Sequence, residues 1–337
     1  MTSKLIACAV LSGALIAITS PSQAQDAEFY RGKTLRILVG TAVGGDYDTQ
    51  ARLVSRHIAR HIPGEPAVIV ENMTGAGGMN MANYLFNLAA KDGTYVGVMP
   101  NNFPALQWSG GRGIQFDVAK FGWLGALTQE TETMVAWHTS GIKTIADVQQ
   151  KEVIAGATGR GAITYTFPAM LNALIGTKFK IVTGYAGGSD VNLAMERGEV
   201  VARLNSWTSW KATKPEWVQN GWINVLIQAG RRHPDLANVP SLEPMAKTPD
   251  DRQLMELINL GNELGRPFAS PPGIPQERLK VLRDAFKAVS KDPKLLAEAA
   301  TMRMELDPMD GEEMQRKIDG VLKTPKELLP RAKDFLE

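Results

Sequence analysis

Apolar runs and stretches of helical spacing alternate along the first third of the chain. The segment Thr34 to Gly40 alternates and then becomes uniformly apolar, which is typical of a strand buried in an α/β sheet. From Thr49 to Ile62, apolar residues recur every three or four positions, which predicts a helix that Pro63 and Gly64 end. The same criteria predict strands at 67–71 and 95–99 and a helix at 79–90. Strands that alternate with helices predict a parallel sheet.

The middle of the chain repeats this rhythm. Strands are predicted at 153–157 and 180–183, and helices at 144–149, 164–175 and 189–198. A stretch rich in Pro, Asp, Asn and Ser follows at 231–249, and four helices are predicted at 275–290, 293–302, 311–322 and 326–335. The repeat therefore predicts a second α/β lobe, followed by a helical tail.

Length and composition support two lobes. A chain of 337 residues is too long for the usual single core. We expect the first lobe to be discontinuous, at 25–126 and 248–337, with the second lobe at 127–247. Hydrophobic residues make up 44% and charged residues 21%, as in ordinary globular proteins. The net charge is only +2 and the Lys and Arg residues are dispersed, which argues against a nucleic acid partner.

The N-terminus has the pattern of a secretory signal peptide. Lys4 precedes an apolar run from Leu5 to Ile18, and Ser22 and Ala24 form a small-x-small cleavage site. The alternative is a membrane anchor, but about 14 apolar residues fall short of the roughly 20 that span a bilayer. We therefore expect residues 1–24 to be removed and the protein to be periplasmic. Cys8 would leave with them, so the mature chain has no thiol and forms no disulfide.

Three glycine-rich loops, at 43–48, 157–162 and 185–190, each lie between a predicted strand and a predicted helix. A helix start offers free backbone N–H groups and a positive dipole end, which suit a carboxylate or a phosphate. The alternative is that the glycines only make tight turns. No loop matches a nucleotide-binding motif. Asp46 would repel a carboxylate unless it caps the helix or meets a ligand amine, whereas Arg160 supplies a cation.

Catalytic motifs are absent from the sequence. It contains no G-x-S-x-G and no H-E-x-x-H motif. His57 and His61 have the i, i+4 spacing that can bind a metal, but no acidic third ligand is evident, so we interpret them as exposed histidines. The tryptophans between Trp207 and Trp222 lack interleaved basic clusters, which favours packing or lining a cleft over stacking on nucleic acid. We expect no enzyme activity, metal or cofactor.

Several short motifs, in this order, resemble those of the solute-binding receptors of tripartite tricarboxylate transporters, the periplasmic Bug family. They cover nearly all of the mature chain. The motifs are Tyr30-Arg31-Gly32-Lys33, Gly44-Gly45-x-x-Asp48-x-x-Ala51-Arg52, Val70-Glu71-Asn72-x-x-Gly75-Ala76-Gly77-Gly78, Ala90-x-Asp92-Gly93, Gly198-Glu199-Val200, Asn238-Val239-Pro240-Ser241 and Pro271-Pro272-Gly273-Ile274-Pro275.

The resemblance implies a two-lobed periplasmic binding protein of the Venus-flytrap type, type II-like, with a ligand cleft between lobes that the chain crosses more than once. It implies a monomeric periplasmic receptor that captures a small carboxylate for the membrane components of a tripartite tricarboxylate-type transporter. The implied ligand-binding residues lie in the loops: Gly44, Gly45, Asp46, Tyr47 and Asn101 in the first lobe, and Thr158, Gly159, Arg160, Gly161, Gly188 and Ser189 in the second.

Two departures from the family pattern bear on the ligand. Asp46 and Tyr47 stand where the family usually has Gly-Thr, and Ala162 stands where a small hydroxyl residue often follows the second-lobe glycine. The resemblance implies a di- or tricarboxylate ligand, whereas the two departures, with Tyr47 and the nearby tryptophans, favour an aromatic acid. Two alternatives remain open: a secreted α/β enzyme that acts on a small acid, and a binding subunit that signals to a membrane sensor.

Overall fold

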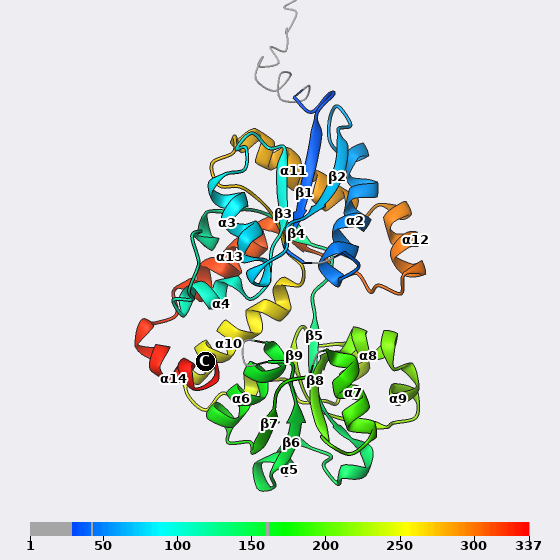
Figure 1. The fold of residues 1–337 in the computed structure, drawn as a ribbon, viewed down its shortest axis with the longest axis vertical. Helices are drawn as coiled ribbons and strands as arrows, with labels where there is room; N and C mark the ends of the chain where they lie inside the picture. The colour runs from blue at the N-terminus through cyan, green and yellow to red at the C-terminus, as the bar shows by residue number, and fades with distance from the viewer. Residues whose placement is uncertain (1–28, 42, 160–161, 186, 337) are drawn as a thin grey trace, which may run out of the picture.

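The computed structural model describes residues 29–41, 43–159, 162–185 and 187–336, and these residues form two α/β lobes, one above the other in Figure 1. The two-lobed α/β fold that the sequence predicts is confirmed. The predicted signal peptide, Cys8, Arg160 and Gly161 lie outside the described residues. No helix of the described part has both the length and the apolar character that crossing a membrane requires.

The first lobe is built on a six-stranded sheet with the order β11-β4-β10-β3-β1-β2. Its strands are β1 (Thr34–Val39), β2 (Ala67–Asn72), β3 (Tyr95–Val98), β4 (Gly122–Ala126), β10 (Phe268–Ser270) and β11 (Met309–Asp310). Its helices are α2 (Asp46–Ile58), α3 (Met79–Asn87), α4 (Phe103–Trp108), α11 (Gln276–Val289), α12 (Pro293–Thr301) and α13 (Gly311–Leu322).

Alternation along β1 explains how this sheet is covered on both faces. Leu35, Ile37 and Val39 belong to a core that includes residues of α2, α11 and α12, whereas Leu38 belongs to a core with residues of α3 and α13. Successive side chains of a strand point to opposite faces, so a strand buried on both sides is apolar throughout. This double burial accounts for the uniformly apolar end of the predicted first strand.

The second lobe is built on a five-stranded sheet with the order β7-β6-β8-β5-β9. Its strands are β5 (Thr131–Trp137), β6 (Val153–Gly156), β7 (Phe179–Val182), β8 (Ala202–Ser206) and β9 (Ile223–Gly230). Its helices are α5 (Ile145–Gln150), α6 (Ile163–Ile175), α7 (Gly188–Glu196), α8 (Trp207–Thr213) and α9 (Pro215–Gln219). Trp207, Trp210 and Trp217 are buried in one of its cores, which confirms that these tryptophans pack.

The prediction of parallel sheets is correct for β1, β2 and β3 and for β6, β7 and β8. It is wrong for the strands that directly follow a passage of the chain between the lobes. Strand β10 runs antiparallel to β3 and β4, and β5 runs antiparallel to β8 and β9. These strands carry the chain into a lobe from the other lobe rather than from a helix of the same lobe. They therefore do not follow the right-handed crossover that makes neighbouring strands parallel.

Helix α10 (Pro249–Leu264) joins the two lobes and was not predicted from the sequence. Its Leu254, Leu257 and Ile258 lie in a core of the second lobe, and its Leu260 and Leu264 lie in a core of the first. The chain passes from the first lobe to the second along 127–130 and returns along 265–267. These two segments lie side by side, since a Cβ on Gly265 would lie 1.7 Å from the Thr128 carbonyl oxygen. The last turn of α10 lies beside them, where the Asn262 carbonyl accepts from the Glu130 N–H at 2.9 Å.

The C-terminal helix α14 (Leu329–Leu336) leaves the first lobe and packs against α6 of the second (Figure 1). Ala332 and Phe335 are fully buried in the core that contains Met170 and Leu171 of α6. Trp108 of α4 lies in the same core, and its indole N–H donates to the Thr324 carbonyl at 2.8 Å. One side of the gap between the lobes is therefore closed by continuous apolar packing.

We keep the division of the chain at 126/127 and 247/248 as a proposal. In that division α14 belongs to the first lobe by sequence but packs on the second.

The interpretation of His57 and His61 as exposed histidines is wrong. His57 is only 8% exposed, and its Nε2 lies 2.6 Å from Glu298, while His61 Nε2 lies 2.7 Å from Asp292. Both acids come from the α12 region, far away in sequence. Arg56 pairs with Glu298 and Arg60 with Asp292, so the acids are neutralised by arginines and fix α12 to α2. Within the described ranges, no group of three or more His, Cys, Asp and Glu side chains could hold a metal ion.

Candidate functional site

A cavity of about 330 Å³ lies between the lobes, next to the first turn of α2. One wall is apolar and comes from α4, α6 and α10, and the other carries a phenol, amides and charged groups. The lining residues are Tyr47, Asn101, Asn102, Pro104, Ala105, Leu106, Ser109, Glu132, Ile163, Thr166, Leu257, Ile258, Leu260, Gly261, Asn262, Arg266 and Leu336. Ligand sites typically combine an apolar wall with a few polar groups in this way.

A second cavity of about 450 Å³ lies on the other side of Arg266 and Glu132, and it is the more polar of the two. Its first-lobe wall includes Gly44 and Asp46, and its second-lobe wall includes Asn205, Ser206 and Thr208. Arg266 and Glu132 line both cavities. These two side chains therefore stand at the centre of the cleft between the lobes.

Arg266 is the main cation of this centre. Its Nε lies 2.6 Å from Asp46 Oδ2, its guanidinium lies 4.8 Å from the centre of the Tyr47 ring, and Glu130 lies 3.9 Å away. Burial disfavours the charge, but Tyr47, Asp46, Glu130 and Glu132 outweigh burial and raise the pKa of Arg266. The guanidinium is therefore held charged and is already engaged by first-lobe groups.

Glu132 is the acid of the cleft whose surroundings most disfavour its ionised form. The residue keeps some exposed surface toward the cavities, but protein surrounds it on the other sides. Burial and the repulsion of Glu130 raise the pKa of Glu132 to about 7, against the opposing effect of Arg266 and Arg203. None of the hydrogen bonds found among the described residues involves its carboxyl group. At neutral pH it is divided between its acid and its carboxylate form.

The raised pKa of Glu132 leads to a prediction for stability. A carboxyl group whose pKa is higher in the folded state binds its proton more tightly there, so its contribution is lost as pH rises through about 7. We expect Glu132→Gln to stabilise the protein by about 1–2 kcal/mol at pH 8 and by much less at pH 5. Urea unfolding of both proteins at the two pH values measures the difference. An equal difference at pH 5 and pH 8 would contradict the assignment.

Arg203 approaches the cleft from the second lobe but is committed to its own lobe. It is 5% exposed, it donates to the Gly188 carbonyl at 2.7 Å and to the Asn192 side chain, and it lies 5.1 Å from the Trp210 ring centre. Burial lowers the pKa of Arg203 to about 10, while Glu132 acts in the opposite direction. Arg203 therefore holds the first turn of α7 in place behind the cleft wall.

The first-lobe residues predicted from the sequence lie at or beside the cleft. Tyr47 and Asn101 line the smaller cavity, and Gly44 and Asp46 line the larger one. The Asn101 N–H donates to the Tyr47 hydroxyl at 3.3 Å, and burial raises the pKa of Tyr47. Gly45 is the N-cap of α2, so the helix begins three residues before the predicted start.

Four of the second-lobe residues predicted from the sequence, Thr158, Gly159, Gly188 and Ser189, do not line either cavity, and Arg160 and Gly161 lie outside the described residues. Thr158 lies in the loop before α6, where its N–H donates to the Thr164 hydroxyl at 3.2 Å, and Gly159 follows it. Gly188 contacts Arg203, and Ser189 is exposed in the first turn of α7. A ligand-binding role for these residues, and for those of the first lobe, stays a prediction.

Sequence reasoning missed the charged centre. Glu130 and Arg266 belong to the segments in which the chain passes between the lobes, and Glu132 is the second residue of β5, directly after the first of them. Charged residues directly beside buried strands were the available signal, because such charges are seldom buried without a partner. Their convergence was not visible, since Arg266 and Asp46 are far apart in sequence.

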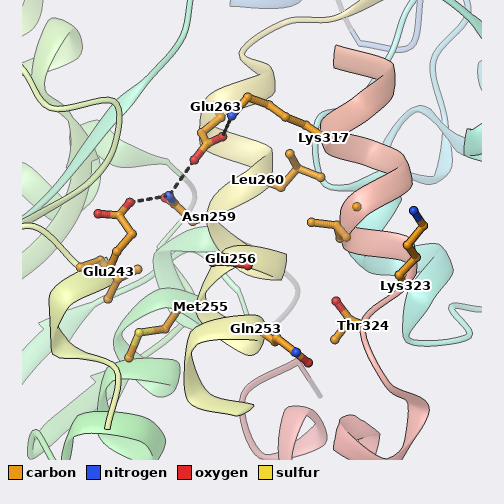
Figure 2. A pocket seen from close by; sticks show the side chains of 13 residues that line it. Glu243, Gln253, Met255, Glu256, Asn259, Leu260, Glu263, Lys317, Lys323 and Thr324 are labelled. Carbon is orange, nitrogen blue, oxygen red and sulfur yellow. Dashed lines mark hydrogen bonds and ion pairs between the residues drawn. The ribbon is translucent and has the colours of Figure 1, made fainter. Parts of the chain in front are cut away.

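A third groove of about 480 Å³ lies on the opposite face of α10, between α10 and α13 (Figure 2). Several of its polar groups pair with each other, whereas Gln253 Oε1 is buried without a hydrogen-bond partner among the described residues. Lys317 pairs with Glu263 at 2.7 Å, and Asn259 donates to Glu243 and to Glu263 at 3.4 and 3.3 Å. Because these groups have partners within the groove, we do not assign the ligand site to it.

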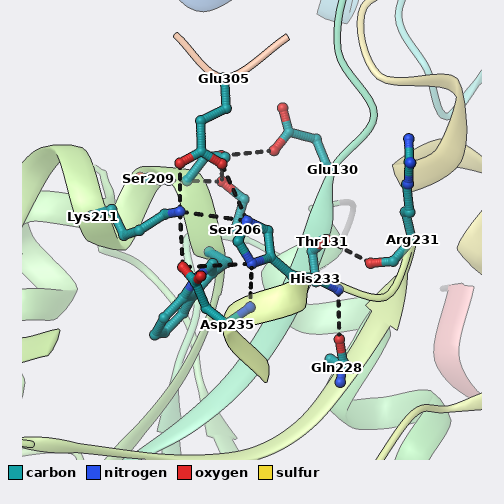
Figure 3. A network of polar contacts seen from close by, with 12 residues as sticks. Glu130, Thr131, Ser206, Ser209, Lys211, Gln228, Arg231, His233, Asp235 and Glu305 are labelled. Carbon is teal, nitrogen blue, oxygen red and sulfur yellow. Dashed lines mark hydrogen bonds and ion pairs between the residues drawn. The ribbon is translucent and has the colours of Figure 1, made fainter. Parts of the chain in front are cut away.

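On the side away from α10, ion pairs join the lobes at the mouth of the larger cavity (Figure 3). Glu305, from the first-lobe segment after α12, pairs with Lys211 of α8, and His233 Nε2 lies 3.2 Å from its carboxylate. Lys211 also lies 3.1 Å from Asp235 of the second lobe. We call Glu305, Lys211, His233 and Asp235 the latch. Nearby, Arg231 pairs with Asp307 across the same gap.

We expect Lys211→Met to weaken the closed arrangement. Lys211 is 27% exposed and has two acidic partners, so its loss should cost about 1 kcal/mol of unfolding free energy and should favour a more open molecule. Small-angle X-ray scattering would then give a larger radius of gyration. Lys180→Met is the matched control, because Lys180 is 63% exposed and its 3.9 Å pair with Glu152 lies within one lobe. An unchanged scattering curve for Lys211→Met would show that the latch does not hold the lobes together.

Comparison with known proteins gives the same fold. No family model matches the chain. A curated protein of Agrobacterium vitis, described as "UPF0065 protein in the TAR-I ttuE-ttuC' intergenic region", is 26% identical over 303 residues, 86% of this chain and 80% of that protein. A TctC solute-binding protein from Polaromonas, determined without ligand, has a TM-score of 0.70 at 18% identity and covers 89% of this chain and 99% of its own.

Two further solved structures have a similar fold. The periplasmic binding protein BugD has a TM-score of 0.61 at 18% identity over 90% of this chain and 99% of its own. A protein of R. palustris determined with adipate has a TM-score of 0.61 at 17% identity over 89% and 97%. The chain therefore has the two-lobed fold of periplasmic solute-binding proteins. Among these it resembles the TctC and Bug proteins, as its sequence motifs predict.

Proposed function

We propose that the protein is a periplasmic solute-binding receptor that captures a small carboxylate between its lobes and delivers it to the membrane components of a tripartite tricarboxylate-type transporter. The observation that carries the proposal is the pair of cavities between the lobes, which meet at Arg266 and Glu132 and draw their walls from both lobes. A ligand held by two lobes stabilises their closed arrangement through its contacts to both. Such a receptor needs no catalytic group.

The size and chemistry of the smaller cavity support a small organic ligand. Its 330 Å³ lies at the lower end of the range for small-molecule sites, about 300–1,000 Å³. Leu257, Ile258 and Ile163 offer an apolar wall along which a short carbon chain or a ring would lie. The adipate in one similar structure is a short-chain dicarboxylate of this kind. Export through a signal peptide at 1–24 and action as a monomer belong to the same proposal.

We assign ligand contacts to both sets of loops. In the first lobe these are Gly44, Gly45, Asp46, Tyr47 and Asn101, and in the second lobe Thr158, Gly159, Arg160, Gly161, Gly188 and Ser189. Three helices, α2, α6 and α7, begin at these loops, and their first turns offer backbone N–H groups to an anion. Further closure of the lobes would bring the second-lobe loops onto a ligand that already contacts the first.

The test is a thermal-shift screen of residues 25–337, refolded to remove any bound solute. Aliphatic di- and tricarboxylates, aromatic acids, sugars and metal ions are compared. At a ligand concentration a hundred times Kd, binding adds about 2.7 kcal/mol to the free energy of unfolding. For a chain of this size we expect the melting temperature to rise by several degrees with one class of carboxylate.

The matched control is the same carbon skeleton without its carboxylates, such as 1,6-hexanediol for adipate. A rise with the diol equal to that with the diacid would mean that the carboxylates are not recognised. A response to sugars or metal ions alone would overturn the carboxylate assignment and favour the secreted-enzyme alternative.

A further inference from the structure

Among the residues that the structure describes, the cleft contains more negative than positive side chains. Asp46, Glu130 and Glu132 surround the single guanidinium of Arg266, at the point where the two cavities meet. Arg303 also lines the larger cavity, but it is exposed at its outer edge, where Glu305 of the latch lies too. An added carboxylate at this centre would meet repulsion rather than a free cation.

The start of α2 is less favourable to an anion than a free helix start would be. The Gly44 N–H donates to Asp48 Oδ2 at 2.8 Å, and Asp46 and Asp48 both lie in the first turn of α2, where their charges offset its dipole. Asp46 makes no capping hydrogen bond. Of the two roles that the sequence left for Asp46, helix capping is therefore excluded. Within the protein, the positive partner of Asp46 is Arg266, which it shares with Glu130 and Glu132.

The two described arginines at the centre of the cleft are already engaged. Arg203 is held by the Gly188 carbonyl, Asn192 and the Trp210 ring, and Arg266 is held by Asp46 and the Tyr47 ring. Glu130 accepts a hydrogen bond from the Thr208 hydroxyl at 3.2 Å. Glu132 faces Glu130, Arg266 and Arg203, and it is the acid of this centre that no hydrogen bond of the described residues satisfies.

We infer that the ligand carries a positively charged nitrogen, placed against Glu132, Glu130 and Asp46, in addition to the carboxylate assigned above. The inference rests on the proposed function and narrows its ligand class to zwitterionic amino acids with a short carbon chain or a ring. The ammonium group occupies the acidic centre, and the carbon skeleton lies along the apolar wall formed by Leu257 and Ile258. The carboxylate is then directed away from Asp46, toward the loops of the second lobe.

Binding of an ammonium group next to Glu132 favours the carboxylate form of that residue. Affinity for an ammonium ligand therefore increases as pH rises from 6 to 8, while Glu132 loses its proton. A ligand that carries only carboxylates at this place shows the opposite trend, because it favours the protonated form. Glu130, Asp46, Tyr47, Arg266 and Arg203 are the other charged or titratable groups facing this centre.

The experiment is isothermal titration calorimetry of residues 25–337 with sets of ligands that share a skeleton. The six-carbon set is adipate, 2-aminoadipate, 6-aminohexanoate and 1,6-diaminohexane, and four-carbon and aromatic sets are built in the same way. We expect an aminated acid to bind at least tenfold more tightly than its nitrogen-free parent. Glu132→Gln should abolish that advantage, whereas Glu277→Gln, at an exposed acid of α11, should retain it.

The outcomes separate the two proposals. If the nitrogen-free acids bind as tightly as the aminated ones, the receptor function stands and the cationic nitrogen is wrong. If diamines bind as tightly as aminated acids, the cationic nitrogen is supported and the carboxylate assignment fails. If no acid, amine or amino acid binds in any set, both proposals fail. Loss of affinity in Glu132→Gln for nitrogen-free acids as well would also overturn the inference, because Glu132 would then act on the carboxylate.

Discussion

Gly265→Ala is expected to lower the free energy of unfolding by about 4 kcal/mol or more. Gly265 has φ +58° and ψ −117°, a region of backbone conformation that residues with a Cβ rarely adopt. A Cβ on this residue would lie 1.7 Å from the Thr128 carbonyl oxygen, which is backbone and cannot turn away. The Gly265→Ala protein would therefore have both backbone strain and a steric clash in its folded state.

This glycine matters because of its position between the lobes. Thr128 belongs to the segment that leaves the first lobe, and Gly265 belongs to the segment that returns to it. The Glu130–Asn262 hydrogen bond of 2.9 Å joins the first of these segments to the last turn of α10, just before Gly265. A side chain at 265 would push them apart and would also move Arg266. We therefore expect ligand binding to be lost in any Gly265→Ala protein that still folds.

Urea unfolding followed by tryptophan fluorescence measures the stability change. Gly320→Ala is the matched control, because Gly320 lies in the exposed interior of α13 and a Cβ there meets nothing within 4 Å. That substitution should be neutral or should stabilise the protein by about 0.5–1 kcal/mol. A Gly265→Ala protein as stable as Gly320→Ala would show that the crossover segments are not packed as described.

Arg266→Met is expected to be the next most damaging change, at about 3 kcal/mol at pH 8. It removes the cation that Asp46, Glu130 and Glu132 share in a recessed site, and an uncompensated charge in such a site is costly. Lower pH should reduce the loss, because protonation of the carboxyl groups removes their mutual repulsion. The raised pKa of Glu132, about 7, means that part of this relief occurs between pH 8 and pH 6.

The measurement is urea unfolding of Arg266→Met and of wild type at pH 8 and pH 6. Arg36→Met is the matched control, since Arg36 pairs with Glu71 on the surface of the first lobe, with both side chains about 40% exposed. Exposed pairs contribute about 0–1 kcal/mol, so the control should lose little at either pH. Equal losses for the two variants, or a loss at Arg266 that does not depend on pH, would contradict the charged centre.

Periodicity predicted many of the helices well, whereas strands β4, β5, β8 and β9 were not predicted. Helix α13 was predicted with its correct bounds, and α6, α7, α11 and α12 within one or two residues at each end. Helix α10 was missed for a physical reason: its apolar residues face two different cores, one in each lobe. A helix that is apolar on more than one side lacks the single stripe by which helices are recognised.

The site was harder to predict than the fold. The glycine-rich loops identified the first-lobe edge of the cleft, because a loop between a parallel strand and a helix must lie at that edge of the sheet. The charges at its centre come from a helix start and two crossover segments, around Asp46, Glu132 and Arg266. Their proximity depends on how the lobes are placed against each other. No spacing within one segment encodes that placement.

The C-terminal helix makes the protein suitable for a fluorescent sensor. Because α14 is anchored in the core of the second lobe, a dye on exposed Asp334 follows that lobe, although the end of the chain comes after first-lobe elements. A second dye at Leu88, which is 73% exposed in the first lobe, completes the pair. Residues 25–337 contain no cysteine, so two introduced cysteines would be the only sites for thiol-reactive dyes. Energy transfer between them would follow lobe closure in real time and would report the solute directly.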